Sequence, residues 1–135
     1  MLKNIPAIFL GCITAILSIV LVAFLSHSLY PMPENLNYED PAVIAPITEN
    51  MPLAQFWLTL FGYAFGSFVG GLVATRMHPE SGKSNTCVVA IILLLLGIMN
   101  MLTIPHPTWF WVVSSSIYMP FALLGSILYA KMENK

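Results

Sequence analysis

Two histidines and four carboxylates are the side chains of this chain best suited to chemistry. His27 ends the first long apolar segment, and His106 lies between the third and the fourth. Two imidazoles and a carboxylate are a feasible zinc or copper ligand set, and also a feasible acid and base pair. The carboxylates lie in residues 26–52: Glu34, Glu39, Asp40 and Glu49. The candidate metal ligands are His27, His106, Glu34 and Asp40, with interfacial histidines and solvated acids as the alternative.

Other kinds of membrane chemistry lack the residues that they need. The apolar segments contain no Asp, Glu, Lys, Arg or His, whereas carriers of protons or charged solutes usually keep an ionisable group inside the bilayer. Haem sites in membranes usually require paired histidines within helices, and the apolar segments contain none. Cys12 and Cys87 form no CxxC or zinc-binding pattern. We therefore predict no enzymatic activity and no cofactor, with both cysteines as small buried hydrophobes.

The composition is that of a membrane protein. Of 135 residues, 58% are hydrophobic and only 8% are charged, against about 25% charged residues in soluble domains. The net charge of −1 and the absence of a basic patch give no reason to expect a nucleic acid partner. The sequence predicts a single membrane domain over residues 1–135, whose main partner is the lipid bilayer.

Four apolar segments have the length that a spanning helix needs, which is about 20 residues. They predict an all-α integral membrane four-helix bundle with helices over residues 5–25, 53–75, 87–104 and 109–130. The first segment is expected to be retained, with cleavage near Ser28 as the alternative. The proline-rich, acidic connection 26–52 predicts an extended cap with a short helix around Pro41–Glu49.

The cationic residues predict the orientation of the bundle. All of them fall on one side of the membrane: Lys3, Arg76, Lys83, Lys131 and Lys135. Because cytoplasmic flanks carry the excess of Lys and Arg, both termini are expected in the cytoplasm of a bacterial inner membrane. Trp57, Trp109 and Trp111 fall at the opposite interface, as anchoring aromatic residues do; a substrate-facing aromatic wall is the alternative reading.

Small residues four apart predict which helices pack together, because association in lipid depends on close backbone approach. Three such stripes occur: Ala7, Gly11 and Ala15; Gly62, Gly66, Gly70 and Ala74; Ala122, Ser126 and Ala130. They predict that the helix 53–75 is central and contacts the first and the fourth helices. The alternative is that one stripe forms a homodimer seam.

A few polar or helix-breaking residues interrupt the apolar segments. Pro120 predicts a tolerated kink in the fourth helix, with a hinge or a ligand-lined bend as the alternative. Asn100 and Tyr63 lie in the half of the bundle opposite the termini. Asn100 is expected to be an interhelical hydrogen-bond partner, or else a pocket residue.

Three motifs together suggest a resemblance. They are Tyr30-Pro31-x-Pro33, the GxxxGxxxGG run 62–71, and Ile104-Pro105-His106-Pro107-x-Trp109-Phe110. The chain resembles small four-helix bacterial inner-membrane proteins of uncharacterised function. The resemblance implies the topology above and no activity, cofactor or site.

Three functions follow as expectations. The first is a non-enzymatic accessory or scaffold subunit that packs in a larger membrane assembly or with itself. The second is a periplasmic-face metal or small-ligand site, or a catalytic site, that uses His27, His106 and an acid of the connection 26–52, which would fold over the hairpin as a lid. The third is a conduit for a neutral or lipidic molecule.

Overall fold

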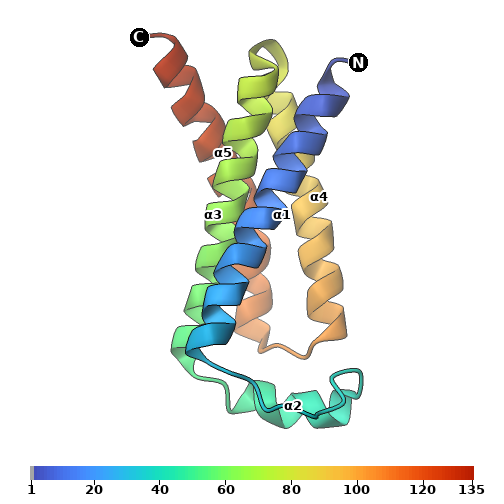
Figure 1. Cartoon of the computed structure of the whole chain (residues 1–135). Coiled ribbons are helices and arrows are strands. Elements are labelled where there is room, and N and C mark those ends of the chain that lie inside the picture. Colours follow the sequence, from blue (N-terminus) through green and yellow to red (C-terminus); the bar gives the residue numbers. More distant parts are fainter. Residues whose placement is uncertain (1) are drawn as a thin grey trace.

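The computed structural model describes residues 2–135, and all its regular elements in that range are helices. In chain order they are α1 (Asn4–Leu29), α2 (Pro41–Glu49), α3 (Leu53–Met77), the short 3₁₀ helix η1 (Pro79–Ser81), α4 (Gly82–Thr103) and α5 (Thr108–Glu133). The prediction of an all-α chain with four long helices is confirmed (Figure 1).

The four long helices have the length and composition to cross a membrane. With 22 to 26 residues each, they measure about 33 to 39 Å at 1.5 Å per residue, and a bilayer core is about 30 Å thick. Both termini and η1 lie at one end of the bundle, called here the termini end, whereas α2 and the α4–α5 connection lie at the other, called the α2 end (Figure 1). This arrangement is consistent with a multi-pass membrane protein.

The predicted start of the third long helix at residue 87 is wrong, because α4 already begins at Gly82. Asn85 and Thr86 make the first turn polar, but both are buried inside the bundle. Hydropathy places a boundary where polar residues begin, and here those polar residues are paired or enclosed by neighbouring helices. The helix therefore continues past the end of its apolar run.

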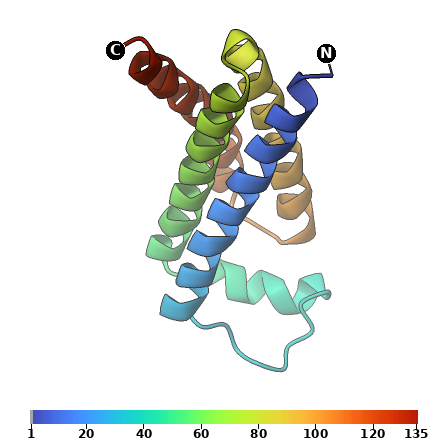
Figure 2. The ribbon, with the colours of Figure 1, turned by 45° about the horizontal axis from the view of Figure 1, so that its top comes forward.

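The short helix expected in the connection 26–52 is confirmed as α2. Asp40 caps it by accepting a hydrogen bond of 2.9 Å from the amide of Ala42, and Pro41 occupies the first turn, where its missing N–H is not needed. The helix crosses beneath the bundle (Figure 2). Ile44 and Thr48 form its buried side. The acidic connection is thus a cap on the bundle. In residues 2–135 the only short helices are α2, which this connection carries, and η1.

The central position predicted for α3 is confirmed, since α3 packs most extensively against α1 and α5 and also touches α4. A Cβ placed on Gly70 would lie 2.9 Å from the carbonyl oxygen of Gly11, and one on Gly11 would lie 2.9 Å from that of Gly70. A Cβ on Gly66 would lie 2.8 Å from the carbonyl oxygen of Ala15. The two small-residue stripes therefore meet backbone to backbone.

The contact of α3 with α5 is equally close but is centred on two glycines outside the predicted stripes. A Cβ on Gly71 would overlap the backbone of Ala122, and one on Gly125 would overlap the backbone of Phe68. Ala122 and Ser126 are buried in this contact, as predicted. Because the α3 glycines face α1 and α5 within one chain, they are not exposed as a seam for a second copy.

Candidate functional site

The α2 end contains a pocket that joins the cap to the hairpin. It has a volume of about 340 Å³ and is lined by Ala45, Thr48, Glu49, Pro105, His106 and Pro107. As predicted, the connection 26–52 lies over the α4–α5 connection. One wall of the pocket belongs to α2, and the other belongs to the α4–α5 connection. Glu49 is the acid that this arrangement brings to the pocket of His106.

His106 is held in one orientation. Its Nδ1 lies 2.6 Å from the carbonyl oxygen of Ile104, and its ring stacks on Phe110 at 4.8 Å between centroids and 14° between planes. A carbonyl oxygen only accepts, so Nδ1 carries the proton and Nε2 keeps its lone pair in the neutral ring. Burial lowers the pKa of His106, while the hydrogen bond to Ile104 acts in the opposite direction. The site offers an oriented, neutral imidazole with a free acceptor nitrogen.

The predicted metal set is not assembled. Across residues 2–135 there is no group of three or more His, Cys, Asp or Glu side chains that could hold a metal ion. His27 is exposed in the last turn of α1 and does not line the pocket of His106. Asp40 is engaged as the cap of α2, and Glu34 is exposed in the turn before it. These side chains belong to different helix ends and loops, and sequence spacing alone does not predict how those segments are oriented relative to one another.

Acidification is expected to loosen this cap. Because burial depresses the folded-state pKa of His106 below the ordinary value of 6.5, the unfolded chain takes up the proton first as the pH falls. The stability contributed by neutral His106 is therefore present above pH 6.5 and is lost as the pH falls through the folded-state pKa. The melting temperature should fall more between pH 7.5 and 5.5 for the wild type than for His106→Gln, and equal pH dependence would contradict this assignment.

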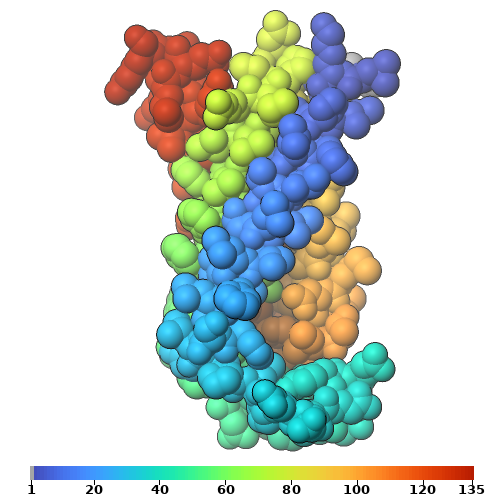
Figure 3. All heavy atoms as spheres, viewed as in Figure 1, coloured from blue at the N-terminus to red at the C-terminus, as the bar shows by residue number. Residues whose placement is uncertain are grey.

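A second cavity lies within the bundle, with a volume of about 190 Å³. Its polar groups are Tyr63, Asn100 and Tyr118, and the remaining walls are Ile16, Ile19, Val20, Leu93, Leu96 and Gly97. Asn100, expected as a hydrogen-bond partner or as a pocket residue, is both a lining residue and the polar neighbour of the Tyr63 hydroxyl. On the face shown in Figure 3, the surface is hollowed between α1 (blue) and α4 (orange).

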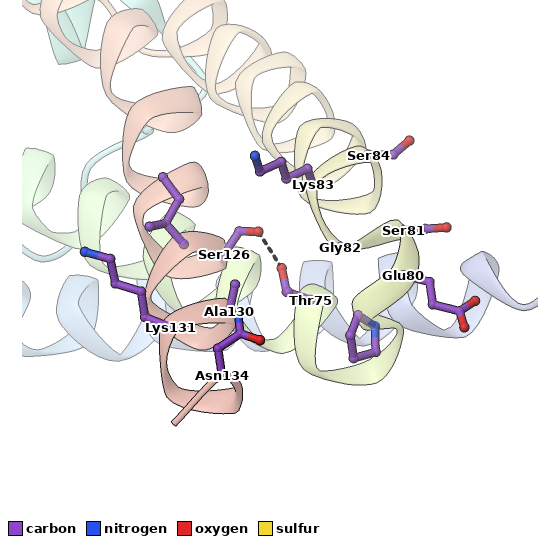
Figure 4. Close-up of a pocket in the computed structure, with 12 residues that line it drawn as sticks. Thr75, Glu80, Ser81, Gly82, Lys83, Ser84, Ser126, Ala130, Lys131 and Asn134 are labelled. Carbon is purple, nitrogen blue, oxygen red and sulfur yellow. Dashed lines mark hydrogen bonds between the residues drawn. The ribbon is translucent and has the colours of Figure 1, made fainter.

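A third pocket of about 610 Å³ lies at the termini end, between the start of α4 and the end of α5. Figure 4 shows Lys83 reaching from α4 toward α5, whereas Ser81 and Ser84 point away from the pocket. Its floor is formed by Thr75 and Ser126, whose hydroxyl oxygens are 2.7 Å apart. The pocket is a wide cleft between two helix ends, lined by two lysines, Lys83 and Lys131, and by one acid, Glu80.

The hydroxyls under this cleft belong to a buried cluster that joins three helices. Thr75 and Thr86 both donate to the carbonyl oxygen of Gly71, at 2.9 and 3.2 Å, and their hydroxyl oxygens are 3.2 Å apart. Ser126 completes the cluster from α5. Because each hydroxyl has a partner within the protein, the cluster explains the packing of α3, α4 and α5.

Sequence reasoning missed Tyr118 and Gly97, which pack against each other in the wall of the interior cavity. The position of Tyr118, a tyrosine in the middle of an apolar segment, was the signal in the sequence that could have indicated this cavity. No protein-family model, curated protein or solved structure matches this chain. Any function must therefore be argued from the geometry of the pockets and surfaces described above.

Proposed function

We propose that the chain is a non-enzymatic integral membrane protein of the bacterial inner membrane, with both termini in the cytoplasm, and that it is an accessory subunit of a larger membrane assembly. The orientation is supported by the positions of the cationic residues, since every Lys and Arg lies in a tail or in the helical turn nearest the termini end. The α2 end carries the acidic connection and the tryptophans, which suits the outer interface.

The observation that supports an accessory role is a concave aromatic surface between α3 and α5, called here the aromatic groove. Its volume is about 390 Å³, and it is lined by Trp57, Leu60, Phe61, Ala64, Phe65, Phe68, Ile117 and Phe121. Phe61 and Phe65 stack at 5.9 Å between ring centroids, and Trp57 and Phe61 are each 57% exposed. The small-residue faces are used inside the bundle, so this groove is the surface left for a partner helix.

Aromatic side chains provide large contact areas and anchor many protein interfaces. In the bilayer a partner helix gains from dispersion contacts with a preformed groove, which flexible acyl chains fill less closely. The groove thus favours association with another membrane protein or with a second copy of the chain.

Photo-crosslinking in native membranes tests this proposal. A photoreactive residue at Phe65, in the groove, is expected to give a discrete protein adduct, whereas one at Leu17, which is 63% exposed on α1, should give none. An adduct of twice the chain mass supports a homo-oligomer, and another mass supports a heteromeric assembly. The proposal fails if neither Phe65 nor Phe121 gives a protein adduct while the variants remain folded.

The pocket of His106 favours a second candidate, the binding of a small polar molecule at the outer face. His106, whose Nδ1 is held by the carbonyl oxygen of Ile104, and Glu49 line one partly open pocket beside α2. Diethyl pyrocarbonate, which modifies neutral imidazoles, should react with His106 more slowly in native membranes than in the purified protein. His27 is exposed and serves as the internal control. Equal relative rates in both preparations would count against a bound ligand.

A further inference from the structure

The floor of the interior cavity consists of two tyrosines that are almost fully enclosed. Tyr118 is 2% exposed and Tyr63 is 6% exposed, and their rings lie 5.4 Å apart between centroids. Gly97 makes room for Tyr118, because a Cβ at this position would collide with the tyrosine hydroxyl. Both side chains line the cavity. None of the side-chain hydrogen bonds made by α4, α5 and their connection involves the Tyr118 hydroxyl.

These hydroxyls lie within the hydrocarbon core if the chain spans the membrane as proposed above. Tyr63 follows the start of α3 at Leu53, and Tyr118 follows the start of α5 at Thr108, by the same number of residues. At 1.5 Å per residue, this spacing places the Cα atoms of both tyrosines about 15 Å from the α2 end. Their hydroxyls lie nearer that end, because the Tyr118 hydroxyl packs against Gly97 and the Tyr63 hydroxyl neighbours Asn100, and α4 ends soon after both positions, at Thr103. The hydroxyls therefore lie in the half of the hydrocarbon core nearer the α2 end, the core being about 30 Å thick. A phenol without a partner is costly there, because neither lipid chains nor bulk water supply an acceptor.

The cavity opens toward lipid rather than toward water. Its exposed lining residues come from only two helices, Ile16 and Val20 of α1 and Leu96 and Asn100 of α4. The hollow between α1 and α4 in Figure 3 lies on the side surface of the bundle, in the half nearer α2. A molecule that reaches the tyrosines must therefore arrive through the bilayer, between these two helices.

The lining and the volume limit the occupant to a small uncharged head. None of the lining residues is Lys, Arg, His, Asp or Glu, so an ionic head would be desolvated without a counter-charge. The volume is about 190 Å³, and an apolar cavity of about 150 Å³ accepts one benzene ring. One six-membered ring that carries an acceptor oxygen matches both the space and the phenol donors.

We propose that this cavity binds the head of a lipophilic cyclic carbonyl compound, such as a quinone or a cyclic ketone with an apolar tail. The Tyr118 hydroxyl donates to the carbonyl oxygen, and the Tyr63 hydroxyl and the Asn100 amide surround the same head. The tail leaves between α1 and α4 into the lipid. The proposal rests on the membrane location given above and is independent of the accessory role.

The test compares two probes of the same shape, decylcyclohexanone and decylcyclohexane, by isothermal titration of the full chain in detergent micelles. The ketone is expected to bind more tightly, because only the ketone accepts a hydrogen bond from Tyr118. Loss of one neutral hydrogen bond corresponds to about a threefold to tenfold change in Kd. Tyr118→Phe should weaken ketone binding by that factor and leave the hydrocarbon unaffected.

A matched pair of tryptophan variants tests the entry route without changing the floor. Leu96 lines the mouth, whereas its neighbour Leu95 is 56% exposed to lipid and does not line the cavity. Leu96→Trp should fill the mouth and weaken ketone binding about tenfold or more, since the displaced head loses its burial and its hydrogen bond. Leu95→Trp should bind like the wild type. Circular dichroism confirms that each variant is folded.

The proposal is overturned if the two probes bind equally, if Tyr118→Phe leaves ketone binding unchanged, or if Leu95→Trp and Leu96→Trp behave alike. These outcomes are separable from failure of the accessory role. Crosslinking from the aromatic groove reports on α3 and α5 at a different surface, so either result can stand without the other.

Discussion

Replacing Gly71 by alanine is expected to destabilise the bundle by about 3 kcal/mol or more, at the upper end of what overpacking costs. The new Cβ would overlap the carbonyl oxygen, carbonyl carbon and Cα of Ala122. Backbone atoms cannot rotate away as a side chain can, so α3 and α5 must separate. The measurement is the free energy of unfolding in a denaturing detergent, or the melting temperature, of purified Gly71→Ala against the wild type.

Gly62 provides the matched control on the same helix. A Cβ on Gly62 would lie 3.1 Å from Cγ1 of Val22, a side chain that can shift by a few tenths of an ångström. Gly62→Ala is therefore expected to cost less than about 1 kcal/mol, within the usual range for a tolerated change. If the two variants were equally stable, the backbone contact between α3 and α5 would not be the tight joint that the structure shows.

Labelling from outside the cell is expected to reach the α2 end and not the termini end. In a background in which Cys12 and Cys87 are replaced by alanine, Glu39→Cys should react with a membrane-impermeant maleimide in spheroplasts, and Ser84→Cys should react only after lysis. Both positions are exposed in the structure, and neither substitution removes a cationic residue. Each cysteine is expected to be labelled either fully or not at all in spheroplasts. The reason is that Lys and Arg residues, which lie at the termini end, are retained on the cytoplasmic side of the membrane.

The reverse pattern would invert the proposed topology. It would place the acidic connection and His106 in the cytoplasm and would remove the outer-face site. Labelling of both cysteines from one side would instead contradict the single membrane crossing, by α3, that separates the two positions. Lysed spheroplasts provide the control for each cysteine, since both must react once the membrane no longer separates them from the reagent.

Much of the fold was predictable because it depends on local properties of the chain. The lengths of the apolar runs identify four long helices, and Asp40 followed by Pro41 identifies the start of α2. The glycine stripe of α3 identifies the central helix, because close approach of two backbones needs residues without large side chains. For the candidate site, the sequence indicated that the acidic connection covers the hairpin of His106.

The tertiary structure decided the features that depend on how one helix is rotated against another. Gly71 and Gly125 lie at the α3–α5 crossing, although neither belongs to a predicted stripe. His106 shares a pocket with Glu49, while His27 stays on the outside of α1.

The chain by itself determined which segments are helices and at which end each polar connection emerges, since hydrophobicity and charge act residue by residue. Only the folded bundle decided that Tyr118 of α5 and Gly97 of α4 come together in the wall of a largely apolar cavity. The physical reason is that a contact between residues far apart in the chain depends on helix rotation and crossing. Those are set by the packing of all the helices together rather than by any one segment.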